Sequence, residues 1–364
     1  MNTTDNNHMR HALALGARGS GRVWPNPAVG CIIVKDGRIV GRGRTGDGGR
    51  PHAETIALAQ AGISSTGATA YVTLEPCSHH GKTPPCADAL VESGITRVVI
   101  ATNDPDPRVS GRGIERLKSS GIVVSTGILE DQAKTAHQGF FTRIAKSRPM
   151  VTLKLAASFD GRIATLTGES QWITGPDSRR MVHAMRARHD AVMVGGGTAR
   201  ADDPTLNVRD IGIEHQPVRV IWSRHLDIPL QGKLAQTARE LPLWIIHSED
   251  ANPDICRAWQ GLGARLFPCA SNQNQIDPSS AMQALGEAGL TRVFCEGGGT
   301  LAASLLSSGL VDELVTFTAG IGIGAEGQPM LGAMGLHRLS RAPRFELVAT
   351  RNIGADTMTR WRAR

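Results

Sequence analysis

The chain has 364 residues, 40% hydrophobic and 20% charged, which is typical of a globular protein long enough for two domains. Six cysteines are too sparse for a disulfide scaffold, and no apolar run is long enough to cross a bilayer. The net charge of +7 comes from dispersed basic residues with few aromatic residues, which disfavours nucleic acid and suits phosphorylated small molecules. The polar N-terminus lacks a secretory signal, so we expect a cytoplasmic protein.

The first part of the chain alternates apolar strands with helical patterns, as α/β proteins do. Residues 29–34 and 38–42 are predicted to form a hairpin around Asp36-Gly37, a dipeptide that favours tight turns. The remaining elements predicted here are strands at 70–74, 97–101 and 122–125 and helices at 52–61, 86–93 and 130–141.

A polar segment that ends in proline, Ala145-Lys-Ser-Arg-Pro149, is the predicted linker, and it divides the chain into domains at 1–147 and 148–364. A helix is expected to begin near Thr174-Gly-Pro-Asp177, where Thr and Asp have capping spacing and Pro stands early in the first turn. The other elements predicted after the linker are strands at 150–157, 191–195, 218–222, 243–247, 292–296 and 313–318 and helices at 281–288 and 300–308.

A metal site is the strongest local signal in the first domain. His52, Cys77 and Cys86 supply three zinc ligands and leave the fourth tetrahedral position for water, as catalytic zinc requires. Zinc lowers the pKa of that water and makes hydroxide available near neutral pH. Glu54 lies two residues beyond the histidine, where it can take the proton from the water and pass it to the departing amine.

The spacing of the cysteines differs from that of most zinc deaminases, which combine H-x-E with P-C-x-x-C. Here eight residues separate Cys77 from Cys86, and the long loop is expected to form part of the pocket wall. His79 and His80 in this loop are competing ligands or pocket residues. A structural zinc, or cysteines buried without any metal, would leave Glu54 without a role.

Several segments around this motif resemble the bifunctional pyrimidine deaminase/reductase of riboflavin biosynthesis. They are Trp24-Pro-Asn-Pro-Ala-Val-Gly30, Pro51-His-Ala-Glu54, Thr73-Leu-Glu-Pro-Cys77, Asn103-Asp-Pro-Asp-Pro107 and Gly111-Arg-Gly113. The resemblance covers nearly the whole chain. It implies a cytidine-deaminase-like, three-layer first domain that removes the 2-amino group of 2,5-diamino-6-(5-phosphoribosylamino)pyrimidin-4(3H)-one.

The resemblance also bears on residues outside the zinc motif. It makes Asn26 a substrate-binding residue, although a turn between two prolines would explain this asparagine equally well. Where the family usually carries a histidine, this chain has Arg44-Thr-Gly-Asp47. Either Thr45 replaces the missing contact or Arg50 binds the phosphate instead.

Two glycine-rich turns follow predicted strands in the second domain, Gly195-Gly-Gly-Thr198 and Glu296-Gly-Gly-Gly-Thr300. Such turns let backbone N–H groups and a helix N-terminus hold a pyrophosphate. Neither turn fits the G-x-G-x-x-G pattern of the Rossmann fold, and each could be only a tight connection.

Together with Leu153–Arg162 and Gly168–Thr174, these turns resemble the reductase half of the same family, which has a dihydrofolate-reductase-like fold and uses NADPH. The resemblance implies a set of NADPH-binding residues, namely Ala156, Trp172, Thr198, Asp202, Ser223, Gly298, Gly299, Thr300, Leu301, Ala302, Ala303 and Ser304. It also implies substrate-binding residues, namely Ser170, Arg186, Leu206, Arg209 and Glu296.

The two predicted substrate arginines are suited to gripping a ribose phosphate through bidentate contacts. Hydride delivery from NADPH to the ring-opened ribose would give the ribityl chain, but the sequence reveals no proton donor for this step. The segment Ala319–Glu326 departs from the lysine-containing sequence usual in the family, so any contact made by that lysine is lost or moved. Arg224, directly after Ser223, is a hypothesis for reading the 2′-phosphate of the cofactor.

Two alternatives compete with a bifunctional enzyme of riboflavin biosynthesis. A zinc deaminase that edits nucleic acid, with an accessory nucleotide-binding domain, would need a basic cluster and stacking aromatic residues, which the sequence lacks. A non-catalytic module with structural zinc would have no use for Glu54. The preferred reading predicts one zinc ion per chain, NADPH, a phosphorylated pyrimidine substrate, no membrane partner, and an oligomeric state that the sequence leaves open.

Overall fold

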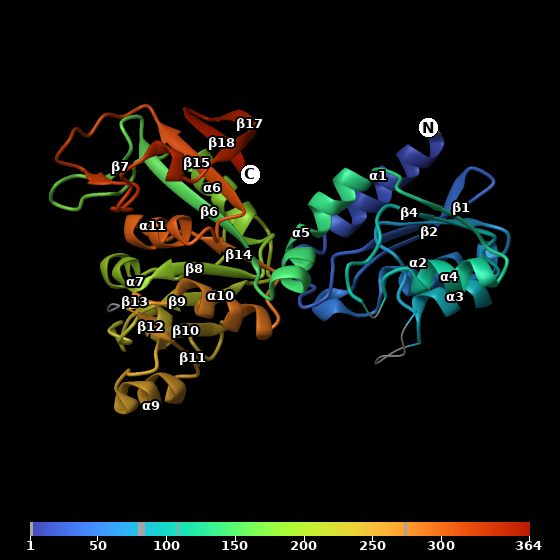
Figure 1. Cartoon of the computed structure of the whole chain (residues 1–364), viewed down its shortest axis with the longest axis horizontal. Coiled ribbons are helices and arrows are strands. Elements are labelled where there is room, and N and C mark those ends of the chain that lie inside the picture. The colour runs from blue at the N-terminus through green and yellow to red at the C-terminus, as the bar shows by residue number, and fades with distance from the viewer. Residues whose placement is uncertain (1–2, 79–83, 108, 273–274) are drawn as a thin grey trace. The chain divides into compact units, whose positions relative to one another are not determined.

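The computed structural model describes residues 3–78, 84–107, 109–272 and 275–364. The chain divides into two compact units, Met1–Ser147 and Arg148–Arg364 (Figure 1). Among the described residues, no helix has both the length and the apolar character needed to cross a membrane.

The first unit is built on a five-stranded sheet with the strand order β2-β1-β3-β4-β5. Strand β1 pairs antiparallel with β2 and β3, whereas β3, β4 and β5 are parallel. The strands are β1 (Gly30–Lys35), β2 (Arg38–Arg44), β3 (Thr69–Val72), β4 (Arg97–Ile100) and β5 (Val123–Thr126). The helices are α1 (Thr3–Ala17), α2 (Ala53–Ala61), α3 (Cys86–Glu92), α4 (Arg112–Ser119) and α5 (Glu130–Lys146), with 3-10 turns at Asp47–Gly49 and Gly62–Ser65.

Helices cover both faces of this sheet. Successive side chains of a strand point to opposite faces, and in β1 the apolar side chains on both faces are buried against helices. Cys31 and Ile33 of β1 pack in the cluster that includes α2, α3 and α4. Ile32 and Val34 pack in the second cluster, with α1 and α5. Figure 1 shows the three layers, with α2, α3 and α4 on one side of the sheet and α1 and α5 on the other.

The predicted hairpin is confirmed as β1 and β2, and its turn has Asp36 and Gly37 at φ 49° and 74°, the signs that a type I′ turn requires. Helix α1, in contrast, has no counterpart among the predicted elements. It is held partly by the buried carboxylate of Asp5, which accepts two hydrogen bonds of 2.9 Å from Arg97 and one of 2.7 Å from Tyr71. These partners are distant in the chain, so a local pattern cannot reveal them.

The second unit contains a nine-stranded sheet with the order β11-β10-β9-β8-β14-β6-β15-β18-β17. All neighbouring strands from β11 to β15 are parallel, and the C-terminal hairpin β17–β18 adds the antiparallel edge. The sheet strands are β6 (Met150–Ser158), β8 (Ala191–Gly195), β9 (Val218–Trp222), β10 (Leu243–Ser248), β11 (Arg265–Cys269), β14 (Arg292–Cys295), β15 (Glu313–Ala319), β17 (Phe345–Ile353) and β18 (Asp356–Ala363).

Helices and short strands complete this unit, and the residues of α7, α8 and α9 form one hydrophobic cluster with β8, β9 and β10. The helices are α6 (Pro176–Arg186), α7 (Gly196–Asp202), α8 (Lys233–Gln236), α9 (Pro253–Gly261), α10 (Pro278–Glu287) and α11 (Gly299–Ser307), with a 3-10 turn at Leu339–Arg341. The short strands are β7 (Arg162–Ala164), β12 (Ser271–Asn272), β13 (Gln275–Ile276) and β16 (Gln328–Pro329).

The capping pattern predicted at Thr174 is wrong. Helix α6 begins one residue later, with Gly175 as its N-cap and Pro176 at its first position. The carboxylate of Asp356 accepts hydrogen bonds from the Gly175 N–H, at 2.8 Å, and from the Ser178 hydroxyl, at 2.6 Å. Strand β18 thus supplies a cap that the local sequence does not contain.

The segment predicted as a linker is more ordered than its polar sequence suggests. Helix α5 continues through Lys146, and Ser147 ends it in the left-handed conformation. The guanidinium of Arg148 is buried and donates hydrogen bonds of 2.7 and 2.9 Å to the carboxylate of Asp312. This ion pair fastens the beginning of the second unit to the start of β15.

Candidate active sites

The predicted metal ligands come together in the first unit. His52 precedes α2, Cys77 follows β3, and Cys86 is the first residue of α3. Their ligand atoms all lie within 4.8 Å of one another, with His52 Nδ1 3.2 Å from Cys86 Sγ and 3.6 Å from Cys77 Sγ. Tetrahedral zinc holds its nitrogen and sulfur ligands about 3.6 Å apart, so the donor set fits this ion.

Helix α2 reaches the metal ligands because it lies directly on strand β2. A Cβ atom on Gly41 would stand 2.2 Å from the carbonyl oxygen of Ala57, and one on Gly43 would stand 2.0 Å from that of Ala53. Only glycine allows this approach. It places His52 and the first turn of α2 beside the loop that follows β3.

Glu54, in the first turn of α2, is buried next to the cluster. Burial, followed by the negative charge of Cys77, raises the pKa of Glu54 to about 7. Hydrogen bonds from the Cys86 thiol and from His52 lower the pKa of Cys77 to about 4. The site therefore favours a thiolate at Cys77 and a carboxyl group that can exchange a proton near neutral pH.

Other residues predicted near this site have backbone partners. Asn26 Nδ2 donates to the carbonyl oxygen of Gly49, at 3.0 Å, three residues before His52. The Thr45 hydroxyl is buried, donates to the carbonyl of Pro27 at 2.9 Å and accepts from Val29 N–H at 3.0 Å. Both hydrogen bonds therefore join the Thr45 side chain to the backbone of residues 27–29. His79 and His80 lie outside the described residues.

Two adjoining cavities open in the second unit. The larger has a volume of about 590 Å³, and all five predicted substrate residues line it, namely Ser170, Arg186, Leu206, Arg209 and Glu296. The smaller has a volume of about 460 Å³ and is lined by residues that include Gly298, Gly299, Thr300 and Leu301. The cavities share wall residues, namely Lys154, Ala156, Ile163, Ser170, Thr198, Asp202 and Glu296.

The order of the parallel strands creates these cavities. Thr198 follows β8 and Glu296 follows β14, which are neighbours in the sheet, so the polar side chains at their carboxyl ends meet. Gly299 begins α11, and a Cβ atom there would lie 3.0 Å from the carbonyl oxygen of Pro329. This glycine therefore lets the segment containing β16 lie against the start of α11.

The remaining predicted cofactor residues have different surroundings. Trp172 lines the larger cavity, is 64% exposed and lies 4.6 Å beneath the Arg179 guanidinium. Ser223 is buried and does not line either cavity, and its hydroxyl donates to Asp227 at 2.6 Å. The last three predicted positions lie further along α11, outside the lining of either cavity, and they are Ala302, Ala303 and Ser304.

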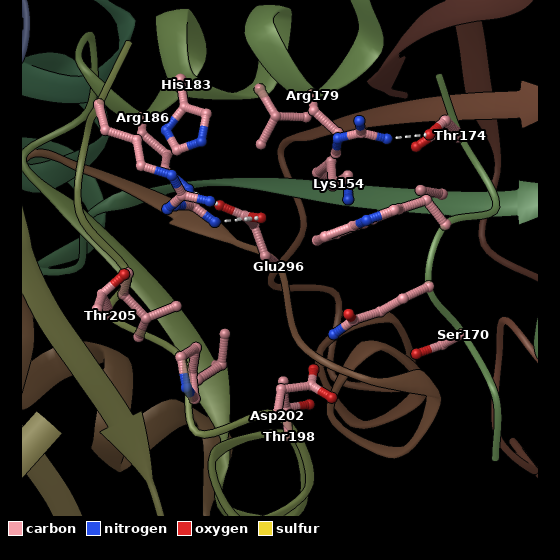
Figure 2. A pocket seen from close by; sticks show the side chains of 18 of the residues that line it. Lys154, Ser170, Thr174, Arg179, His183, Arg186, Thr198, Asp202, Thr205 and Glu296 are labelled. Carbon is pink, nitrogen blue, oxygen red and sulfur yellow. Dashed lines mark hydrogen bonds and ion pairs between the residues drawn. The ribbon is translucent and has the colours of Figure 1, made fainter. Parts of the chain in front are cut away.

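Lys154, Arg179 and His183 line the larger cavity and are absent from the predicted site. Figure 2 shows them around the Arg186–Glu296 pair. Burial lowers the pKa of Lys154, although the charge of Glu296 opposes this shift. A lysine inside the apolar strand β6 is itself a signal, because strands covered on both faces are normally apolar throughout.

Two family models match the chain. The cytidine and deoxycytidylate deaminase zinc-binding region matches residues 2–102, and the RibD C-terminal domain matches residues 149–359. With the His-Cys-Cys cluster and the paired cavities, these matches define a bifunctional enzyme that joins a zinc-dependent deaminase of cytidine-deaminase-like fold to a reductase of dihydrofolate-reductase-like fold.

Relatives that match the entire chain identify its family. The riboflavin biosynthesis proteins RibD of Escherichia coli and Aquifex aeolicus are each 40% identical to it, covering 97% of the chain and 97% and 96% of their own lengths. The chain belongs to the RibD family of riboflavin biosynthesis. Zinc and NADPH are the cofactors of this family.

Solved structures agree with this assignment. Acinetobacter baumannii RibD in form 1 matches with a TM-score of 0.89 and 37% identity, over 99% of both chains. The Thermotoga maritima diaminohydroxyphosphoribosylaminopyrimidine deaminase/5-amino-6-(5-phosphoribosylamino)uracil reductase matches with a TM-score of 0.86 and 35% identity, again over 99% of both. Of the functions weighed from the sequence, the bifunctional enzyme is therefore confirmed.

Proposed function

We propose that residues 1–147 deaminate 2,5-diamino-6-(5-phosphoribosylamino)pyrimidin-4(3H)-one and that residues 148–364 reduce the product with NADPH. In the first reaction water replaces the 2-amino group, which leaves as ammonia. In the second, a hydride and a proton convert the ribosyl group into the ribityl chain. The observation that carries the first assignment is the cluster of His52, Cys77 and Cys86 with Glu54 buried beside it.

In the deaminase unit, His52, Cys77 and Cys86 would hold zinc, which lowers the pKa of a bound water to near neutrality. The carboxylate of Glu54 takes a proton from the attacking water and delivers it to the departing amino group. Its burial keeps bulk water from competing for that proton. Asn26 donates a hydrogen bond to Gly49, three residues before His52, and in this proposal it belongs to the turn that faces the pyrimidine ring.

In the reductase unit, NADPH supplies the hydride. We assign the cofactor to the smaller cavity, where residues at the start of α11 offer backbone N–H groups to its phosphates. The substrate occupies the larger cavity. Lys154 lies in the wall common to both, so its ammonium group can donate a hydrogen bond or a proton where substrate and cofactor meet.

We assign different roles to the two predicted substrate arginines. Arg186 directs two donors to Glu296 and a third to the carbonyl oxygen of Asn207, so it orients Glu296 rather than gripping phosphate. Arg209 is half exposed at the cavity, with a 3.6 Å contact to Asp210 and a 3.3 Å hydrogen bond to Asn207. Arg209 is therefore our candidate for the substrate phosphate.

The proposal also includes partners and location. The phosphorylated pyrimidine is the partner that the family's activity supports, and independence from nucleic acid remains a prediction. A homo-oligomer is left open. We expect a cytoplasmic location because thiolate ligands and free cysteines stay reduced there.

The test is a Glu54→Gln variant, supplied first with the diaminopyrimidine and then with its deaminated product plus NADPH. We expect about one zinc per chain, no ammonia release, and NADPH oxidation at close to the wild-type rate. Wild-type protein should release ammonia without NADPH and oxidise NADPH when it is added. Loss of both activities in a folded, zinc-loaded variant would contradict the assignment of one reaction to each unit.

A further inference from the structure

The carboxylate of Glu75 is buried and, within the part of the chain that the structure describes, accepts four hydrogen bonds from backbone N–H groups. Oε1 accepts from Gly113, at 3.0 Å, and from Ile114, at 3.3 Å. Oε2 accepts from Gly111, at 3.1 Å, and from Asp104, at 3.4 Å. The Glu75 side chain thus binds both the start of helix α4 and the turn that follows β4.

Three of the four donors belong to the N-terminus of α4, whose first N–H groups have no partner within the helix. The N-cap residue, Gly111, has no side chain that could satisfy them. Glu75, 36 residues earlier in the chain, takes the place of a local cap. A negative charge is also favourable at this end of the helix dipole.

The same contact reaches the zinc site, because Glu75 lies two residues before the ligand Cys77. A Cβ atom on Gly113 would stand 2.1 Å from the carbonyl oxygen of Pro76, so the first turn of α4 touches the backbone between Glu75 and Cys77. On its other side, Cys77 receives a hydrogen bond from the N–H of Cys86, and its carbonyl accepts from Ala87 N–H at 3.1 Å. The Cys77 loop is therefore held between α3 and α4.

Asp104, whose N–H is the fourth donor, is also buried. Its Oδ1 accepts a 2.8 Å hydrogen bond from the N–H of Asp106, which closes the turn at residues 104–107. Burial raises the pKa of the Asp104 carboxyl group, and the negative charges of Asp106, Glu75 and Cys77 add to this shift. The turn thus lies in the neighbourhood of the zinc ligands, on the side that Glu75 holds.

We propose that Glu75 is a positioning residue of the deaminase, which holds the turn at residues 104–107 and the start of α4 in place beside Cys77, so that this turn forms a fixed wall for the substrate. The inference rests on the proposed location of deamination in this unit. Only a carboxylate meets the requirement, because each of its two oxygens accepts two N–H groups. A glutamine would turn an NH₂ group toward two of these donors.

The test compares zinc-loaded Glu75→Gln with wild type at a temperature well below the unfolding transition of either protein. We expect KM for the diaminopyrimidine to rise about tenfold or more, equivalent to about 1.4 kcal/mol of lost binding. Turnover at saturation, zinc content and reduction of the supplied product should stay within about threefold of wild type, which is under about 0.7 kcal/mol. Glu115→Gln, an exposed change in the same helical turn, is the matched control and should leave KM unchanged.

Gly113→Ala provides a second variant in case Glu75→Gln does not fold. It keeps the carboxylate but pushes the start of α4 away from Pro76, so KM should rise here too. An unchanged KM in either folded variant would overturn the inference and leave Glu75 with a purely structural role. Failure of the proposed function gives a different result, since Glu54→Gln would then still release ammonia.

Discussion

Arg186 and Glu296 form a two-point ion pair in the wall of the larger cavity, with Nε–Oε1 and Nη2–Oε2 separations of 2.5 and 3.0 Å (Figure 2). Both side chains are mostly buried, at 13% and 10% exposed. Burial opposes ionisation of Glu296, but the charge of Arg186 holds the pKa of this carboxyl below its usual value. Each residue therefore depends on the other to remain charged away from water.

Replacing Arg186 with methionine should lower the free energy of unfolding by about 3–5 kcal/mol, because Glu296 would stay buried without its partner. Urea denaturation followed by tryptophan fluorescence measures this change. The double variant Arg186→Met/Glu296→Gln should recover much of the stability but not the reductase activity. The control is Arg257→Met, which breaks the exposed pair with Asp254. Equal losses in Arg186→Met and Arg257→Met would contradict the prediction.

Cys86→Ser should lose most of its zinc, because a catalytic site with three protein ligands cannot spare one. Metal analysis of the purified protein should give about one zinc per chain in the wild type. Cys256→Ser is the matched control, since that cysteine lies in α9 of the other unit and should leave the zinc content unchanged. Full zinc occupancy in Cys86→Ser would contradict the assignment of Cys86 as a ligand and would indicate His79 or His80 in its place.

The enzyme should prefer NADPH strongly over NADH, and Arg224→Ala should weaken this preference by about one to two orders of magnitude. A charge-assisted contact with the 2′-phosphate is worth about 1.5–3 kcal/mol, and 1.4 kcal/mol corresponds to a factor of ten. In the structure Arg224 lies 3.3 Å from Asp250, and Ser223 donates to Asp227, so both residues have carboxylate partners that a phosphate would replace.

The ratio of kcat/KM for NADPH to that for NADH should be measured in wild type, Ser223→Ala and Arg224→Ala. Arg239→Ala removes an exposed arginine elsewhere in the unit and serves as the control. An unchanged ratio in both the Ser223 and Arg224 variants would mean that the 2′-phosphate is read at another position.

The stability of the second unit should fall as the solution becomes acidic, because His189 is buried in its neutral form. Its Nδ1 lies 2.7 Å from the carbonyl oxygen of Met185 and its Nε2 lies 3.0 Å from the Thr152 hydroxyl. Burial lowers the pKa of His189 from 6.5 to about 3. Between these values the unfolded chain binds a proton that the folded chain does not. The contribution is therefore complete above pH 6.5 and is lost as the pH falls toward about 3.

His189→Gln should reduce the slope of the free energy of unfolding against pH. The reduction should reach up to about 1.4 kcal/mol for each pH unit between pH 6.5 and about 3. Denaturation midpoints between pH 7.5 and 5 would show the difference, followed by tryptophan fluorescence, because five of the six tryptophans lie in the second unit. His225→Gln, an exposed substitution, should keep the wild-type slope. Identical slopes in wild type and His189→Gln would show that another group carries the effect.

The sequence by itself determined those features whose physical cause is local. The turn at Asp36-Gly37 needs positive φ angles, so its residues predict the hairpin without knowledge of the rest of the chain. An apolar run predicts the parallel strand β8, and a mostly apolar run that contains Arg219 predicts β9, at the bounds that these strands have. The zinc motif is also readable because few other roles require His-x-Glu at a helix start together with two distant cysteines.

Only the tertiary structure decided the partners of charged groups, because these depend on which distant segments the sheet brings together. Arg186 and Glu296 are 110 residues apart and meet through the order of the strands. Lys154 enters the site because β6 lies between β14 and β15. Glu75 replaces a cap that α4 lacks, and Asp356 replaces the one expected at Thr174. A buried charge accepts any partner of suitable geometry, so the local sequence cannot specify which residue that partner is.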